Sequence, residues 1–445
     1  MTLDNYDIIL LVIAYLTFTI CVMYRILKQI ATDKKIKLMT FINLYYMIYY
    51  CIVPIFSIIN IYNNYEFNYY YLSFERKYYY IYFFISIIFY ICINFIWKAI
   101  HKENKKHLVY KIDIDTKKFL LITVLFTLIG GGALLLWTKA YGKPWDMIKY
   151  STMVRSGLKP VTNKYTFLKP FCYFSIFAFY NCIIAKKSKY KKSYIILMII
   201  NLASSVLYLL NNDGRTAMLI FVAAIILYKV NNNITINPKS ILKYFIIIFG
   251  MFLFFSQLDN ITYFVRHGET QEKTTSNAIS SVIINNFSYV YRNGINIEYL
   301  IDKQIYSGTS ELEDLKNIVY AWVPTRYKEN NITLLERNSS YYLDYNATIP
   351  SDIITSSLYK FHYVGIIIMS FVLVIIITIL ERIIMKYNSK YTTFIYNYIG
   401  IWLCMALLSS YDASFLLFNC FSLIISFIIT TMLCKNKKED VVNEK

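Results

Sequence analysis

Charged residues are scarce in this sequence, and their scarcity argues against an ordinary soluble protein. Only 16% of the 445 residues are charged, while 57% are hydrophobic. A soluble globular domain carries about 25% charged residues. Glycine and proline are also few, at 12 and 7 residues, which argues against a disordered or low-complexity chain.

Cysteine chemistry and the common cofactor motifs are also missing. The 8 cysteines lie in or at the ends of apolar runs, and none of them forms a Cys-x-x-Cys pair. We therefore expect no disulfide framework and no zinc or redox site. The sequence has no His-x-x-x-His pair, phosphate loop or Gly-rich dinucleotide motif, so neither a metal nor any other cofactor is expected.

Long apolar runs fill most of the chain instead. About 20 apolar residues cross a bilayer as a helix, and these runs predict an all-α polytopic membrane protein with about 11 transmembrane helices. The whole chain, 1–445, is expected to form a single integral membrane domain. The three glycines at 130–132 predict close helix packing or a bend rather than ligand contact. The runs cover residues 8–24, 38–59, 79–97, 119–137, 168–185, 194–210, 216–228, 244–255, 363–380, 394–408 and 415–433.

The distribution of basic residues predicts the orientation. If the N-terminus is outside, the cytoplasmic segments carry 27 basic and 8 acidic residues, which account for the whole net charge of +19. Lys and Arg are retained on the cytoplasmic side of membranes, so this alternation predicts an outer N-terminus and a cytoplasmic C-terminus. Because the charges are spread over short loops, nucleic-acid binding is not expected. The cytoplasmic segments are 25–37, 98–118, 186–193, 229–243, 381–390 and 434–445.

One long loop, 256–362, is predicted to lie outside the cytoplasm. Loops of this length without a function are uncommon in compact domains. Within it, residues 276–291 place apolar side chains at helical spacing, which predicts an amphipathic helix. The loop should therefore be partly helical and pack on the membrane surface or dip into the helix bundle.

Arg215 is the first candidate site residue. It lies in the tight connection 211–216 between two apolar runs, beside Asp213 and Gly214. Ionisable residues near membrane depth are often functional, and the guanidinium group binds phosphate with a planar fork. The alternative is an interfacial arginine that pairs with Asp213 and caps the next helix.

Further candidates lie in the outer segments. Arg266 and His267 follow the eighth run, and His267 could act as a general base or phosphate partner, or be a solvated loop residue. An arginine next to an asparagine can hydrogen-bond hydroxyl or phosphate groups, although each such pair could also be a surface pair. Six loop carboxylates are candidate bases, and their spacing selects none. The further arginines are Arg155, Arg292, Arg326 and Arg337, and the carboxylates are Glu269, Glu298, Asp302, Glu336, Asp344 and Asp352.

The chain resembles the Wzy-type polymerases of lipid-linked oligosaccharide repeat units, which build O-antigen and capsular polysaccharide. The likeness covers nearly the whole chain in its plan of many spans with a dominant late outer loop. Three short segments add to it: 212–216 entering an apolar helix, the basic stretch 153–157, and the loop exit from 347–350 through 363–365.

This resemblance implies a multi-pass protein of the bacterial cytoplasmic (inner) membrane, with a fold similar to the GT-C glycosyltransferases. A glycan on undecaprenyl pyrophosphate would be the donor and one lipid-linked repeat unit the acceptor, without metal or nucleotide. Membrane lipids and a chain-length regulator protein are the further candidate partners. His267 would serve as the base, and pyrophosphate would be bound by Arg155, Arg215, Arg266, Arg292, Arg326 and Arg337.

Other functions are compatible with the same plan. An O-antigen ligase would share the donor and differ in its acceptor. A flippase of lipid-linked oligosaccharides, or another transporter, usually has shorter loops and more charge within its spans. A glycosyltransferase that uses lipid-phosphate sugars usually has an acidic pair in its first outer loop, where Glu66 and Glu75 are too far apart. A structural or receptor protein is a further alternative.

Overall fold

The computed structural model describes the helical framework of the chain. The described residues are 3–33, 37–62, 75–101, 108–111, 115–139, 165–185, 188–211, 215–232, 278–304, 334–340 and 349–385, with short pieces elsewhere. They form two compact units. The first comprises Met1–Asn104, Thr274–Leu380 and Leu403–Leu417, and the second Lys105–Lys273, Glu381–Trp402 and Phe418–Lys445. Each unit is considered by itself.

Seven helices in the described part of the chain are long and apolar enough to cross a membrane. They coincide with seven of the predicted runs, and the prediction of a helical polytopic membrane protein is confirmed to that extent. A helix also covers the run 216–228. The run 244–255 lies outside the described residues, and 394–408 and 415–433 are described only in part. The number of eleven spans, their orientation and the single domain stay predictions.

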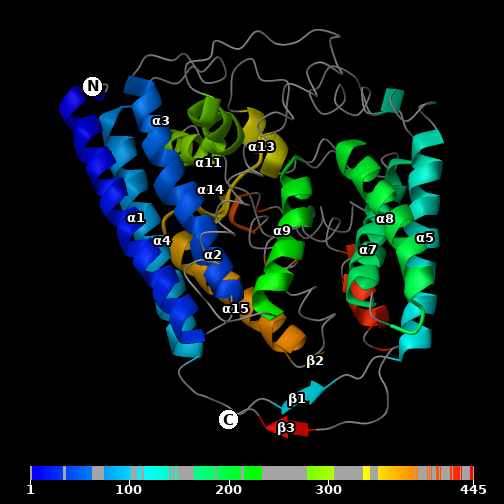
Figure 1. Ribbon diagram of the computed structural model, residues 1–445. Helices are drawn as coiled ribbons and strands as arrows, with labels where there is room; N and C mark the ends of the chain where they lie inside the picture. Colours follow the sequence, from blue (N-terminus) through cyan, green and yellow to red (C-terminus); the bar gives the residue numbers. More distant parts are fainter. Residues whose placement is uncertain are drawn as a thin grey trace. The chain divides into compact units, whose positions relative to one another are not determined.

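The first unit is built from the N-terminal helices and the predicted outer loop (Figure 1). A π-helical turn, η1, joins α2 to α3 without interruption. From the loop come α11, which confirms the helix predicted over 276–291 and extends beyond it, and the short α13 and α14. The elements are α1 Asn5–Asp33, α2 Leu38–Met47, η1 Ile48–Ile52, α3 Val53–Tyr62, α4 Arg76–Ile100, α11 Ala278–Asp302, α13 Leu334–Ser340, α14 Ile353–Phe361 and α15 Val364–Met385, which leaves this unit after Leu380.

Helix α11 lies in the core of this unit, although it belongs to a loop. It contacts α3, η1, α4 and α14, and every residue from 290 to 298 is buried. Tyr291 packs against Tyr15 and Tyr82, with ring centroids 6.1 and 5.7 Å apart. A Cβ atom at Gly294 would overlap the Tyr82 ring, so glycine permits the close approach of α11 to α4. This helix of the predicted loop therefore packs into the helix bundle.

The second unit is a helical group with a small sheet. It contains η2 Thr166–Cys172, α5 Thr116–Lys139, α7 Tyr173–Ala185, α8 Lys191–Asn211 and α9 Arg215–Asn232. Amide side chains link the helices, since Asn201 donates to the Thr127 hydroxyl at 2.7 Å and Asn181 to that of Thr123 at 3.3 Å. Such hydrogen bonds between helices satisfy polar groups that water cannot reach.

Three short strands depart from the predicted all-α chain. Strand β1, Leu108–Lys111, pairs in parallel with β2, Tyr387–Asn388, and antiparallel with β3, Val441–Asn443. Sequence periodicity missed them because each is only two to four residues long. All three lie in segments that the charge pattern assigns to the cytoplasm.

Gly130 gives the first testable prediction. A Cβ atom there would collide with Ser175 of α7, whereas nothing lies within 4 Å of the corresponding position at Gly131. Gly130→Ala should therefore destabilise the protein, by about 1–3 kcal/mol as for other overpacked contacts. Gly131→Ala is the matched control in the same helix and should leave stability unchanged or slightly higher. Thermal unfolding in detergent measures both, and equal melting temperatures would contradict the close packing of α5 on α7.

Candidate functional site

The asparagines that follow two of the predicted arginines, Arg292 and Arg337, contact each other in the structure. Asn338 on α13 donates from Nδ2 to Oδ1 of Asn293 on α11, at 3.3 Å. Both asparagines are buried, at 1% exposure each. The pairs Arg292-Asn293 and Arg337-Asn338 lie 45 residues apart in the chain, yet their helices meet here. We call this group the asparagine cluster.

The asparagine cluster also holds the segment 349–350 that leads out of the loop. Asn293 donates from Nδ2 to the carbonyl oxygen of Pro350 at 2.7 Å, and Asn338 to that of Ile349 at 3.1 Å. The Tyr359 hydroxyl of α14 donates to Oδ1 of Asn338 at 3.3 Å. Buried carbonyl groups need such partners, so the asparagines fix the backbone where α11, α13 and α14 converge.

Arg292 directly precedes Asn293 on α11, and its side chain is buried. Only 7% of its surface is exposed, whereas Arg337 is partly exposed. Removing a guanidinium group from water costs free energy that partners must offset. A buried arginine is consequently uncommon without a structural or functional reason. The local dielectric constant around a buried guanidinium group is low, so an anion that reached Arg292 would be attracted to it strongly.

The six candidate carboxylates differ in burial and in hydrogen bonding. Glu269 and Asp344 lie outside the described residues, and the side chain of Glu336 does as well. Asp302 is at the exposed end of α11, where hydrogen bonds from Lys77, at 2.9 Å, and Tyr78, at 2.7 Å, lower its pKa. Glu298 and Asp352 are buried, at 1% and 0% exposure.

Asp352 has a structural explanation. It is the N-cap residue of α14 and accepts from the backbone N–H groups of Ile354 and Thr355, at 3.2 and 3.3 Å. The Thr355 hydroxyl also donates to it, and the Tyr50 hydroxyl of η1 lies 2.9 Å away. Burial raises the pKa of Asp352 to about 6, although these hydrogen bonds lower it. This carboxyl caps α14 and joins it to the N-terminal helices.

Glu298 has no comparable structural role. Its Oε2 atom accepts a hydrogen bond from the Tyr363 hydroxyl at 2.8 Å, and its Oε1 atom is buried without a hydrogen-bond partner. Burial raises the pKa of Glu298 to about 7, against the lowering effect of Tyr363. Among the carboxyl groups that the structure describes in the loop, this one has the features of an acid or base that works near neutral pH.

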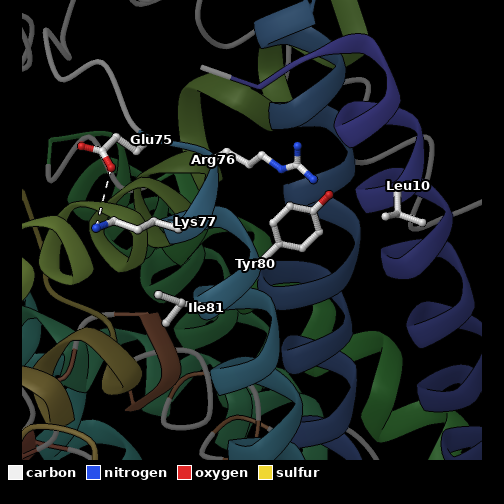
Figure 2. A pocket seen from close by; sticks show the side chains of 6 residues that line it. All are labelled: Leu10, Glu75, Arg76, Lys77, Tyr80 and Ile81. Carbon is white, nitrogen blue, oxygen red and sulfur yellow. Dashed lines mark ion pairs between the residues drawn. The ribbon is translucent and has the colours of Figure 1, made fainter. Parts of the chain in front are cut away.

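Ion pairs at the ends of α1, α4 and α11 hold this arrangement in place. Arg76 lies 2.8 Å from Asp7, which also accepts from the Tyr80 hydroxyl at 2.8 Å. Figure 2 shows the shallow pocket beside them, between Leu10 of α1 and the first turns of α4. Its cations Arg76 and Lys77 already have acidic partners, so the pocket is a weak candidate for binding an anion.

The remaining predicted site residues cannot be placed beside this cluster. Arg155, Arg266, His267 and Arg326 lie outside the described residues. Arg215 begins α9 in the second unit, and its side chain lies outside the described part of the chain. The roles of these five residues stay predictions.

Sequence reasoning missed several residues that hold the site together. Tyr50 and Tyr359 contact it from positions distant in the chain, 302 residues from Asp352 and 21 from Asn338. Both tyrosines are among 45 in the sequence, so composition gave no signal for them. The sequence alone indicated only the asparagine that follows each of the two arginines.

Comparisons with known proteins identify no relative. No family model, no curated protein and no solved structure matches the chain.

Glu298 gives a prediction about stability and pH. Because burial raises its pKa to about 7 from an ordinary 4.5, the folded protein retains a proton that the unfolded chain releases. The stability from protonated Glu298 is full below about pH 4.5 and is lost as the pH rises to about 7. The wild type loses this stability as the pH rises, and glutamine does not titrate. The stability of Glu298→Gln relative to wild type should therefore increase from pH 5 to pH 8, by on the order of 3 kcal/mol.

Thermal unfolding in detergent at both pH values checks this result. Asp302→Asn is the control, since Lys77 and Tyr78 lower the pKa of Asp302 and its removal should give no such gain. A difference between Glu298→Gln and wild type that is the same at pH 5 and pH 8 would show that Glu298 is not buried as described.

Proposed function

We propose that this protein polymerises lipid-linked oligosaccharide repeat units for O-antigen or capsular polysaccharide, at the outer face of the bacterial cytoplasmic membrane. The observation that carries the proposal is the buried Arg292 on α11, a helix of the predicted outer loop that packs into a membrane helix bundle. Buried arginine suits the pyrophosphate of a lipid-linked donor. The family resemblance of the sequence points to the same chemistry.

The proposed reaction transfers the growing glycan. The acceptor hydroxyl oxygen bonds to the anomeric carbon of the donor, and the bond from that carbon to the pyrophosphate oxygen breaks. Undecaprenyl pyrophosphate leaves with the electron pair, and the hydroxyl proton passes to a base. The donor bond is already activated, so the proposal requires neither nucleotide nor metal.

Arg292 would stabilise the charge that develops on the leaving pyrophosphate. A fixed cation in a partly dry site acts most strongly when negative charge accumulates in the transition state. Arg337 would assist from α13. Arg155, Arg215, Arg266 and Arg326 are proposed as further contacts to the same group, and His267 as the base suggested by the sequence.

The membrane arrangement supports the proposal. A polyprenyl chain remains in the bilayer, so its pyrophosphate must be bound at the bilayer surface. Arg76 and Lys77 at the start of α4 pair with Asp7 at the start of α1 and with Asp302 of α11. These contacts bring the loop helix to the ends of α1 and α4 that are predicted to face outward.

A reconstitution assay tests the proposed function. Purified full-length protein in proteoliposomes is mixed with the authentic lipid-linked repeat unit, without added metal or nucleotide. Longer lipid-linked glycans are expected on electrophoresis. Their absence with the authentic substrate would contradict the polymerase, and transfer only to a different acceptor would indicate a ligase.

Arg292 gives the matching variant prediction. Arg292→Ala should reduce the polymerisation rate by about 100-fold, as expected for the loss of one group that stabilises transition-state charge. Arg292→Lys should recover part of the rate, because it keeps the charge without the planar fork. Arg382→Ala is the control, since Arg382 is exposed in the last turn of α15. Normal rates in folded Arg292→Ala and Arg337→Ala would refute the role of these arginines.

A further inference from the structure

Glu298 and Tyr363 form an isolated acid–phenol pair in the first unit. Glu298 lies one turn before the end of α11, and Tyr363 immediately precedes α15. The Tyr363 hydroxyl donates to Oε2 of Glu298 at 2.8 Å. The carboxyl is 1% exposed, whereas Tyr363 is 49% exposed. The pair thus has one end inside the protein and one end at its surface.

The charged neighbours leave Glu298 without a counter-ion among the residues described. Asp302 is one turn along α11, and it engages Lys77 and Tyr78 of α4. Lys303 pairs at 3.7 Å with Glu75. The other titratable groups shortly before Tyr363 are His362 and Lys360, and the Lys360 ammonium group lies over the Tyr411 ring, 4.9 Å from its centroid. The Oε1 atom of Glu298 is buried and unpartnered, which is costly unless the group is protonated or has another use.

We infer that Tyr363 contacts the acceptor sugar and that Glu298 receives the acceptor's proton through it. This inference rests on the proposed polymerase function and assigns the role of proton acceptor to Glu298 in place of His267. As the acceptor oxygen bonds to the anomeric carbon and the pyrophosphate leaves, the acceptor's hydroxyl proton moves to Oη of Tyr363. The phenol proton moves at the same time to Oε2 of Glu298. Tyr363 is the catalytic residue, and Glu298 is a positioning residue that acts through it.

The ionisation properties of the two groups support this relay. Burial raises the pKa of Glu298 to about 7, so the carboxyl can take up a proton during the reaction and release it afterwards. Burial and the neighbouring Glu298 raise the pKa of Tyr363 above its ordinary value. The phenol therefore stays protonated and passes a proton on instead of holding a charge.

A purely structural role is the alternative explanation. The hydrogen bond could serve only to join α11 to the start of α15, and its loss would then change stability without changing the pH dependence of the rate. The pair formed by Tyr80 and Asp7 offers a comparison, because this phenol also donates to a buried carboxyl at 2.8 Å. Tyr80→Phe is accordingly a matched control.

The experiment measures single-turnover elongation by the full-length protein in proteoliposomes, with the authentic lipid-linked repeat unit, across neutral pH. The wild-type rate should rise through about pH 7. Glu298→Gln and Tyr363→Phe should each lower the rate by about 100-fold with little change in KM, and Glu298→Gln should lose the rise near pH 7. Glu298→Asp should retain that rise at a reduced rate, which separates the carboxyl group from its packing. Tyr80→Phe should retain both the rate and the rise.

A wild-type pH profile in Glu298→Gln, or a wild-type rate in Tyr363→Phe, would overturn the relay. A profile that is lost in His267→Gln and retained in Glu298→Gln would assign the base to the histidine instead. Either result in the variants leaves the polymerase proposal intact, provided that the wild-type protein elongates the lipid-linked glycan. If the wild-type protein makes no glycan longer than the supplied repeat unit, the proposed function is itself refuted, and the relay is refuted with it.

Discussion

Burial of polar groups on α11 is the constraint around which the first unit is built. A helix from a long loop enters the bundle with Arg292, Asn293 and Glu298 at 7%, 1% and 1% exposure. These buried groups cannot hydrogen-bond to bulk water, so their partners must come from the protein. Asn293 and Asn338 satisfy one another and the carbonyl groups of Ile349 and Pro350. Each hydrogen bond contributes about 1 kcal/mol net, but leaving one group unpaired costs more.

The same constraint distinguishes two buried carboxyl groups. Asp352 and Glu298 are both buried, and burial alone would treat them alike. Asp352 is surrounded by donors from Tyr50, Thr355 and the backbone of α14. Glu298 has one donor and one unpartnered oxygen. Asp352 therefore caps α14 with its hydrogen-bonding capacity used, whereas Glu298 retains unused hydrogen-bonding capacity and can accept a proton in the proposed relay.

Much of the fold was predictable because bilayer crossing leaves a strong sequence signal. The runs 38–59 and 119–137 appear as continuous apolar helices, and the glycines at 130–132 include one that packs directly on Ser175. The helix over 276–291 followed from its apolar spacing. The short strand pairing of β1 with β2 and β3 did not follow, because segments of two to four residues carry no reliable periodicity.

The site was less predictable because its contacts join distant parts of the chain. Nothing in the local sequence links Tyr50 to Asp352, which are 302 positions apart, or selects Glu298 from six loop carboxylates. The arginine–asparagine pairs could be found in the sequence. The contact between Asn293 and Asn338 could not, because it depends on how α11 and α13 pack. Arg215 and His267 were equally prominent in the sequence, and their side chains lie outside the described residues.

Hydrogen exchange of the purified full-length protein tests most directly whether α11 is a core element. The amides of 290–302 should exchange as slowly as those in the middle of α4, and Asn338→Ala should speed exchange in 290–302 and in α14. Rapid exchange of 290–302 in the wild type, at the rate of a solvated loop, would contradict the burial of α11 and the site built on it.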